Sequence, residues 1–239
     1  MLKQIVRRVL GTAGLGIVRL RDPYLEIARL LGADSVRTVV DGGAYRGVTV
    51  LRSHELFRAA TIHAFEPQQE SFERLRSTVG QLDRVRLHAM ALSDTNGEHA
   101  FFVNETAYTS SLLPARTSAM REVDRRTVPV RTLDTVMAEV GVSTVDVIKL
   151  DLQGHELAAL RGAEHTLASC RALLVEVNFR QRYEGACSFE ELAGFLGQRD
   201  FGLFRLYEIA AAADTGWAHA DALFLRPRPP PDLQKSRDS

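Results

Sequence analysis

The stretch VVDGGAYRGVTV, Val39 to Val50, decides the fold because it places an aspartate and two adjacent glycines directly after an apolar run. RTVVDGG (37–43) predicts a β-strand, and RGVTVLRSHELF (46–57) predicts the helix that follows it. Glycine tolerates positive φ and lets the backbone approach a ligand without a Cβ in the way. The stretch therefore predicts a strand, a glycine-rich turn and a helix, and the turn is either a tight connection or part of a ligand site.

Strand-like runs alternate with helix-like runs along the rest of the chain, which is typical of βαβ units and a mainly parallel sheet. RVRLHAMALSD (84–94) predicts one continuous strand, and ELAALRGAEHTLAS (156–169) predicts one continuous helix. The segment Glu105–Arg126 has no strong period and predicts a binding loop or lid. FGLFRLYEI (201–209) and DALFLRP (221–227) predict a closing antiparallel pair of strands.

The composition is that of a globular protein, with 239 residues, 45% hydrophobic and 25% charged. Thirty basic residues balance thirty acidic ones, so no global field favours nucleic acid or an anionic membrane. No apolar run approaches the roughly 20 residues of a membrane span. The predicted organisation is an N-terminal helical arm (1–34), one catalytic domain (35–226) and a disordered tail (227–239).

Two cysteines, Cys170 and Cys187, form no disulfide framework and no CxxC motif, which favours a cytoplasmic location. The N-terminus pairs basic residues with an apolar stretch, but glycines interrupt that stretch and no small-residue cleavage site follows. We therefore expect an arm rather than a signal peptide. The oligomeric state stays open, with a homodimer among the alternatives.

Polar residues cluster where the predicted strands end. In an open parallel sheet, ligands bind beyond the carboxyl ends of the strands, near the point where strand order reverses. One shared site is therefore predicted there. Its candidates are Asp41, Gly42, Gly43, Glu66, Asp94, Asp151 to Glu156, Glu176 and Asn178.

The glycine order indicates a nucleoside-bearing cofactor without fixing which one. Gly-Gly-x-x-x-Gly differs from the G-x-G-x-x-G of dinucleotide-binding turns. Glu66 ends the second strand about 20 residues later, where a carboxylate can accept hydrogen bonds from both ribose hydroxyls. At this point a nicotinamide-dependent oxidoreductase, a methyltransferase and an inactive binding module with a methyltransferase-like scaffold remain alternatives.

Five segments resemble the FkbM family of S-adenosylmethionine-dependent methyltransferases. They are VVDGGAYRGVTV, IHAFEPQQESFERL, ALSDTNG, RTLD and DVIKLDLQGHELAALRGA, and they span about Thr38 to Phe204. The resemblance implies an α/β class I methyltransferase (Rossmann-like) fold, with a seven-stranded, mostly parallel sheet and helices on both faces. It also implies an O-methyltransferase that acts on a hydroxyl of a sugar, a polyketide or another small metabolite.

The resemblance further implies roles for residues that match its motifs. Asp151 would face the transferred methyl group and the methionine amine. Tyr45 and Arg46 depart from the small or asparagine-like residues often found after the glycines, so no contact role is carried onto them. The implied cofactor residues are Asp41, Gly42, Gly43 and Ala44 for methionine and ribose, Glu66 for the ribose diol, and Pro67, Ser93 and Asp94 for the adenine.

The acceptor side offers two mechanisms. His155 lies four residues after Asp151, and an ordinary imidazole pKa near 6.5 suits a general base. A magnesium-like ion is the second mechanism, held by oxygen ligands from Asp151, Glu156, Glu176 and Asn178. The predicted acceptor contacts are Tyr108, Ser110, Ser111, Arg116, Glu176 and Asn178.

Overall fold

A computed structural model describes residues 22–117, 120–212 and 216–227. Most of the predicted N-terminal arm, residues 1–21, and of the predicted tail, residues 228–239, lies outside the described residues. None of the helices in the described ranges has the length and the apolar character needed to cross a membrane.

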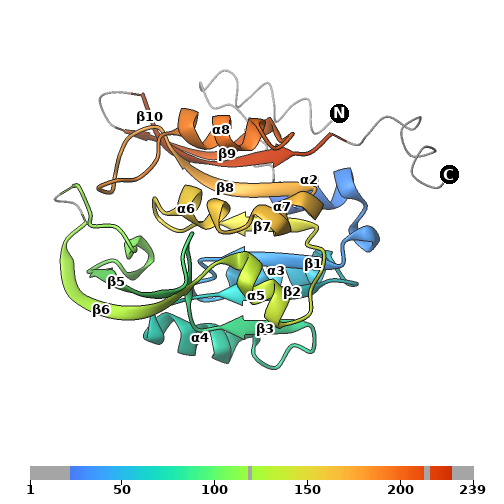
Figure 1. Cartoon of the computed structure of the whole chain (residues 1–239), viewed down its shortest axis with the longest axis horizontal. Helices are drawn as coiled ribbons and strands as arrows, with labels where there is room; N and C mark the ends of the chain where they lie inside the picture. Colours follow the sequence, from blue (N-terminus) through green and yellow to red (C-terminus); the bar gives the residue numbers. More distant parts are fainter. Residues whose placement is uncertain (1–21, 118–119, 213–215, 228–239) are drawn as a thin grey trace, which may run out of the picture.

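A seven-stranded sheet forms the centre of the molecule (Figure 1). Its parallel part runs from β3 to β8, and β10 runs antiparallel to both β8 and β9. The predicted mostly parallel seven-stranded sheet is confirmed. In sheet order the strands are β3 (Val85–His88), β2 (Thr61–Phe65), β1 (Thr38–Gly42), β7 (Val147–Leu150), β8 (Ala172–Asn178), β10 (Gly216–Leu225) and β9 (Gly202–Ala212).

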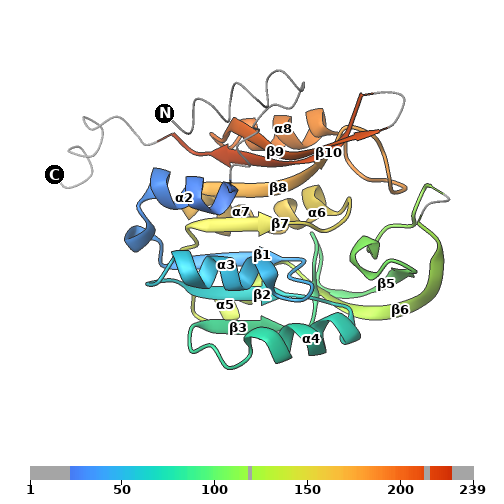
Figure 2. The ribbon, with the colours of Figure 1, turned by 180° about the vertical axis from the view of Figure 1, so that it is seen from behind.

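Helices cover both faces of this sheet, as Figures 1 and 2 show from opposite sides. Each face has its own apolar core, because the buried strands carry apolar side chains on both faces. One face carries α2 (Pro23–Leu31), α3 (Val48–Leu56) and α4 (Gln69–Val79); the other carries α5 (Leu133–Glu139), α6 (Glu156–Arg161), α7 (Glu164–Ser169) and α8 (Phe189–Gly197).

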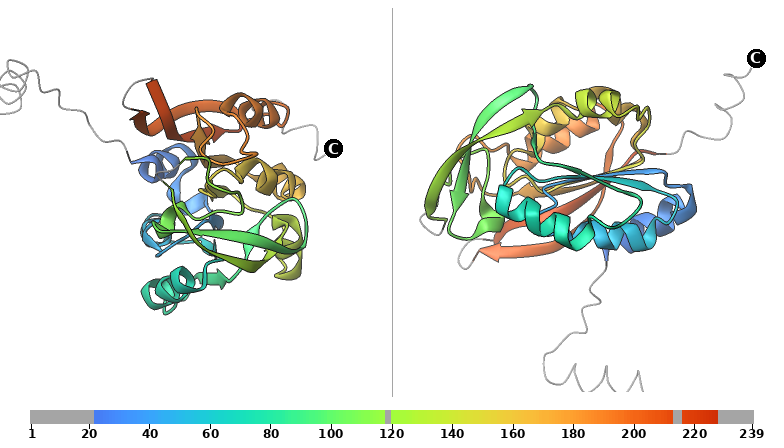
Figure 3. Two further views of the ribbon diagram at one scale, coloured as in Figure 1. Left: turned by 90° about the vertical axis from the view of Figure 1, so that its left-hand side faces the viewer. Right: turned by 90° about the horizontal axis from the view of Figure 1, so that it is seen from below.

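A small second sheet lies beside the carboxyl edge of the first. It joins β4 (Ala91–Leu92), β6 (Glu122–Arg131) and β5 (Gly97–Asn104), drawn in green in Figure 3. The prediction of one strand over 84–94 was wrong, because the chain leaves the central sheet after β3 and enters the second sheet at β4. The prediction of an irregular segment up to Arg126 was also partly wrong, because β6 begins at Glu122.

The predicted helix over 156–169 is interrupted between α6 and α7. Gly162 stands at the interruption, where an added Cβ would lie 2.0 Å from the carbonyl oxygen of Ser93. The ALSD turn therefore packs directly on the helical layer, and only glycine fits there. The same glycine accepts a hydrogen bond from Asp134 N through its carbonyl, at 3.0 Å.

Candidate functional site

The central sheet has its switch point between β1 and β7. The chain proceeds from β1 to β2 and β3 on one side, whereas β7 and β8 lie on the other side. Gly43 and Asp151 follow these two strands, and the amide of Asp151 donates to Gly42 O at 3.1 Å. A crevice between strands that turn away from each other is the usual ligand position in open α/β sheets.

The adjacent glycines serve this approach of β7. Gly43 has a φ of 74°, and a Cβ on it would lie 2.0 Å from the carbonyl oxygen of Asp151. A Cβ on Gly42 would lie 2.8 Å from a methyl carbon of Leu150. The glycines were expected to make room for a ligand, and the structure shows that they make room for β7. Gly43 nevertheless also lines the cavity described next.

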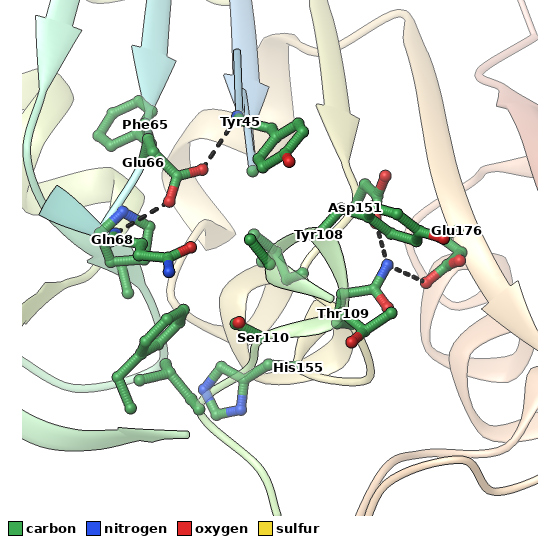
Figure 4. Close-up of a pocket in the computed structure, with 18 of the residues that line it drawn as sticks. Tyr45, Phe65, Glu66, Gln68, Tyr108, Thr109, Ser110, Asp151, His155 and Glu176 are labelled. Atoms are coloured by element: carbon green, nitrogen blue, oxygen red, sulfur yellow. Dashed lines mark hydrogen bonds between the residues drawn. The ribbon is translucent and has the colours of Figure 1, made fainter. Parts of the chain in front are cut away.

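A cavity of about 570 Å³ opens at this edge of the sheet. Figure 4 shows Glu66 on one side of it and Asp151 with Glu176 on the other. Residues Thr106 to Ser110, between β5 and β6, form part of its wall. The remaining lining residues are Gly43, Tyr45, Phe65, Pro67, Gln68, Met90, Ala91, Leu92, Phe101, Leu112, Met120, Leu152, Gln153, His155, Arg182 and His219.

Glu66 presents a buried carboxylate to the cavity from the end of β2. Its Oε2 accepts from Tyr45 N and its Oε1 from Gln68 N, both at 2.9 Å. Burial raises the pKa of Glu66 to about 7, and the two amides oppose that rise. A carboxylate has four lone-pair sites, so both oxygens retain acceptor capacity for a ligand.

Gln153 joins two carboxylates at the opposite end of the cavity. Its Nε2 donates to Asp151 Oδ1 at 2.6 Å and to Glu176 Oε2 at 3.1 Å. The pKa of Glu176 is raised well above its ordinary value by burial and by the charges of Asp151 and Glu156. Arg182 Nη1 lies 3.5 Å from Glu176 Oε1. This end of the cavity is therefore a polar, charged surface.

The backbone of Gln153 is strained to reach this position. Its φ is 54°, which is uncommon for a residue with a side chain. Contacts with two elements hold it there: the Ser111 hydroxyl donates to Gln153 O at 2.8 Å, and the Tyr183 hydroxyl lies 2.6 Å from Gln153 Oε1. Strained residues of this kind cluster at binding sites, where the surrounding structure compensates for them.

His155 lies at the start of α6, with its imidazole on the cavity wall. Its Nε2 is 2.9 Å from the hydroxyl of Ser93. Burial lowers the pKa of His155 to about 4, a shift that the charge of Asp94 opposes. The imidazole is therefore neutral across the physiological range.

The four predicted metal ligands do not converge on one point. Glu156 Oε1 accepts from Leu152 N at 2.8 Å and from Gly154 N at 3.1 Å, so this oxygen is turned towards the loop amides. Asn178 is buried and does not line the cavity. Within the described ranges, no group of three or more His, Cys, Asp or Glu side chains is placed to hold a metal ion.

Comparison with known proteins decides the family. A protein-family model, the methyltransferase FkbM domain, matches residues 41–203. The chain belongs to the FkbM methyltransferase family. The 2-O-methyltransferase NoeI of Sinorhizobium fredii (strain NBRC 101917 / NGR234) is 29% identical over 159 residues, which cover 62% of this chain and 65% of that relative. The chain therefore spans less than two thirds of the length of this relative.

Two solved structures share the fold. An rRNA methylase from Streptococcus thermophilus aligns with a TM-score of 0.52 and 12% identity over 89% of this chain and 99% of its own. The fibrillarin pre-rRNA processing protein of Methanococcus jannaschii aligns with a TM-score of 0.51 and 13% identity, over 86% and 76% respectively. These likenesses confirm the class I methyltransferase fold and nothing finer.

The cavity of this FkbM protein fits the family's cofactor, S-adenosylmethionine. Glu66 offers free acceptor sites suited to a ribose diol, and apolar side chains suited to an adenine ring lie nearby. Asp151 offers a half-exposed carboxylate suited to a cation, at the switch point of the sheet. The apolar lining consists of Phe65, Met90, Leu92 and Phe101.

The cavity brings together only part of the predicted site. Gly43, Glu66, Pro67, Tyr108, Ser110, Asp151, His155 and Glu176 line it. Asp41, Gly42, Ala44, Ser93, Asp94, Ser111, Arg116, Glu156 and Asn178 do not. Several of these support their neighbours instead, as Ser93 supports His155 and Ser111 supports Gln153. Arg116 is exposed and pairs with Gln181.

Sequence reasoning missed several lining residues. Gln153 lies within the predicted range Asp151 to Glu156, but no role of its own was predicted for it. Arg182 and His219 come from outside the family motifs, and no pattern in the sequence points to them. Tyr45 contributes through its backbone amide, which residue identity does not reveal.

Proposed function

We propose that the protein is an S-adenosylmethionine-dependent O-methyltransferase that acts on a hydroxyl of a small metabolite. The observation that carries this proposal is one cavity with the buried Glu66 carboxylate at one end and Asp151 at the other. When bound, the cofactor supplies an electrophilic methyl group. Gly43, Glu66 and Pro67 would hold its adenosyl part. The nicotinamide-dependent alternative is not favoured, because the matching family is a methyltransferase family.

A sugar hydroxyl is the acceptor class that we propose first. The acceptor end combines the Glu176 carboxylate, the Arg182 guanidinium and the His219 imidazole with the exposed ring of Tyr108. Such a surface can bind several hydroxyls while an aromatic ring covers an apolar sugar face. The printed name of the relative, a 2-O-methyltransferase, supports oxygen as the methylated atom.

Two residues are proposed for the chemistry. Asp151 would orient the cationic end of the cofactor, because a carboxylate at this point attracts positive charge. His155 would accept the proton of the acceptor hydroxyl; its imidazole is free of a proton at physiological pH, and its pKa near 4 makes it a weaker base than an ordinary histidine. Collinear placement of the two reacting groups would supply much of the remaining rate.

Transfer of a labelled methyl group tests the function directly. Purified protein is incubated with methyl-labelled cofactor and a panel of sugars, phenolic metabolites and a short RNA, each with and without chelator. We expect labelled methyl ethers of a sugar, unchanged by the chelator, and no labelled RNA. Loss of turnover with chelator would instead favour a metal. Thermal stabilisation by NAD and not by S-adenosylhomocysteine would overturn the proposal.

Glu66→Gln is expected to weaken S-adenosylhomocysteine binding by about 1.5 kcal/mol, the low end for hydrogen bonds to a charged group. Wild-type affinity should rise as pH increases through about 7, because ionised Glu66 is the better acceptor. The variant has no such ionisation, so its affinity should be flat over that range. Titration calorimetry from pH 6 to 8 checks both expectations, and equal pH dependence in the two proteins would remove this role.

The same substitution has an opposite effect on the ligand-free protein. A carboxyl whose folded pKa is raised stabilises the fold below its unfolded pKa, and this contribution is lost as pH rises through the folded value. Between pH 5 and pH 8, the free energy of unfolding of the wild type should therefore fall by about 2 to 3 kcal/mol relative to that of the Glu66→Gln variant. Denaturant unfolding at the two pH values measures this difference.

A further inference from the structure

Lys149 is a buried lysine in a chain whose basic residues are almost all arginine. Thirty residues are Lys or Arg, and only Lys3, Lys149 and Lys235 are lysines. Lys149 is 8% exposed and lies on β7, two residues before Asp151. A buried charge is costly unless it is paired and hydrogen-bonded, so this ammonium needs a structural reason.

The ammonium of Lys149 is surrounded by oxygens of β1 and of the turn after it. Its Nζ donates to Gly43 O at 3.0 Å and to Gly42 O at 3.4 Å, and it lies 3.2 Å from Asp41 Oδ1. Burial alone would lower the pKa of Lys149, but the charges of Asp41 and Asp151 outweigh it and raise the pKa. A compact ammonium with three donors fits this set of acceptors, whereas a planar guanidinium does not.

The turn held by Lys149 is the turn that holds Glu66. Lys149 bonds the Gly43 carbonyl, and two residues later Tyr45 N donates to Glu66 Oε2. Gly43 N and Ala44 N both donate to the carbonyl of Phe65, at 3.1 and 2.9 Å. A continuous set of bonds therefore runs from β7 through the turn to the end of β2.

Asp41 completes the arrangement from inside the protein. It is 1% exposed, and its Oδ2 accepts from the Thr49 hydroxyl in the first turn of α3. Lys149 and Asp41 do not line the cavity described above. Lys149 lines a second groove between α2, α3 and β9, and Asp151 lines both the groove and the cavity. Neither group lines the Glu66 end of the cavity. An effect on a ligand there passes through the bonds of the turn and through charge, because Lys149 lowers the pKa of Glu66 and Asp41 raises it.

We propose that Lys149 is a positioning residue that, together with Asp41, fixes the Gly43–Tyr45 turn and thereby Glu66 for cofactor binding. This inference rests on the proposed function, because it assigns the ligand of that turn. The rival role is direct binding of the cofactor's methionine carboxylate by the ammonium. The two roles predict different results when Lys149 is replaced. Loss of positioning weakens binding of the adenosyl part, whereas loss of direct binding weakens only ligands that carry the amino-carboxylate.

Lys149→Met separates the roles when two ligands are compared by titration calorimetry. S-adenosylhomocysteine carries the amino-carboxylate, and 5′-methylthioadenosine lacks it. We expect both ligands to lose about tenfold in affinity, the lower end for loss of a group that orients a contact residue. Loss confined to S-adenosylhomocysteine would overturn the proposal in favour of direct binding, and unchanged affinity for both would overturn it outright.

Two further variants keep the result interpretable. Asp41→Asn/Lys149→Met removes both charges, so it restores folding if the single variant leaves Asp41 buried and unpaired; its affinities should still be about tenfold weaker for both ligands. Arg171→Met removes the Arg171–Asp146 ion pair, 2.9 Å long, at the opposite edge of the same sheet. It should lower the melting temperature without changing either affinity.

A wild-type protein that binds neither ligand would refute the cofactor assignment and not the role of Lys149 within it. Recovery of wild-type affinity in the double variant would show that the pair serves stability alone and would end the proposal. The two failures are therefore distinguishable by the wild-type titration.

Discussion

Asp151→Asn is expected to lower kcat by about 10³-fold, the scale of losing a preorganised charge next to a reacting centre. Asparagine keeps the shape of the side chain but removes the negative charge at the switch point of the sheet. Asp151 stands between the Gln153 amide, at 2.6 Å, and the Lys149 ammonium, at 4.0 Å. With the charge removed, the cationic end of the cofactor loses its counter-charge.

Single-turnover methyl transfer at saturating cofactor measures this loss. The matched control is Asp134→Asn, which removes a carboxylate that bonds His165 and Thr166 N at the start of α7, away from the cavity. That control should lower the melting temperature and leave kcat within twofold. Near-normal kcat in Asp151→Asn would exclude the residue from the reacting centre.

His155→Ala is expected to lower kcat by about 10²-fold, the low end for removal of a general base. The dependence of kcat on pH should have the same shape in His155→Ala as in the wild type from about pH 5.5 to 9. The reason is that the pKa of His155 near 4 leaves the wild-type imidazole neutral throughout that range. A base with the ordinary imidazole pKa would instead add an inflection near 6.5.

Ser93→Ala is the companion variant for this test. It removes the hydroxyl that lies 2.9 Å from His155 Nε2 but keeps the imidazole, so we expect a smaller decrease in kcat. Affinity for S-adenosylhomocysteine is measured in both variants. An unchanged kcat with weakened affinity in His155→Ala would assign the histidine to cofactor binding and leave the proton to Glu176 or to solvent.

The central sheet could be predicted because its strands are buried on both faces and read as apolar runs. Val147–Leu150 and Ala172–Asn178 are buried throughout; Asp151 follows the first strand and Asn178 ends the second, so a polar residue marks the carboxyl end of each. β6 could not be predicted in full, because its first half, EVDRR, is exposed and carries no alternation. The break at Gly162 depends on contact with Ser93, which lies about 70 residues away in the sequence.

The site was only partly predictable for a related reason. Residues at strand ends, such as Glu66 and Asp151, were found because topology brings strand ends together. Asp41 was expected to contact the cofactor, whereas it is buried behind the turn and paired with Lys149. Which side of a strand end faces the ligand depends on the neighbouring strand, and one sequence does not contain that information.

The wall of the cavity between β5 and β6 belongs to the small sheet and shares no strand with the central one. Residues 106–110 can therefore change in length or sequence without altering the hydrogen bonds between the parallel strands, whereas Ser111 is needed to hold Gln153. On the proposed assignment, these residues border the acceptor and the parallel strands carry the nucleoside. Evolution can thus diversify the methylated compound by loop replacement, and a chimera that carries the loop of another FkbM protein should inherit its choice of alcohol.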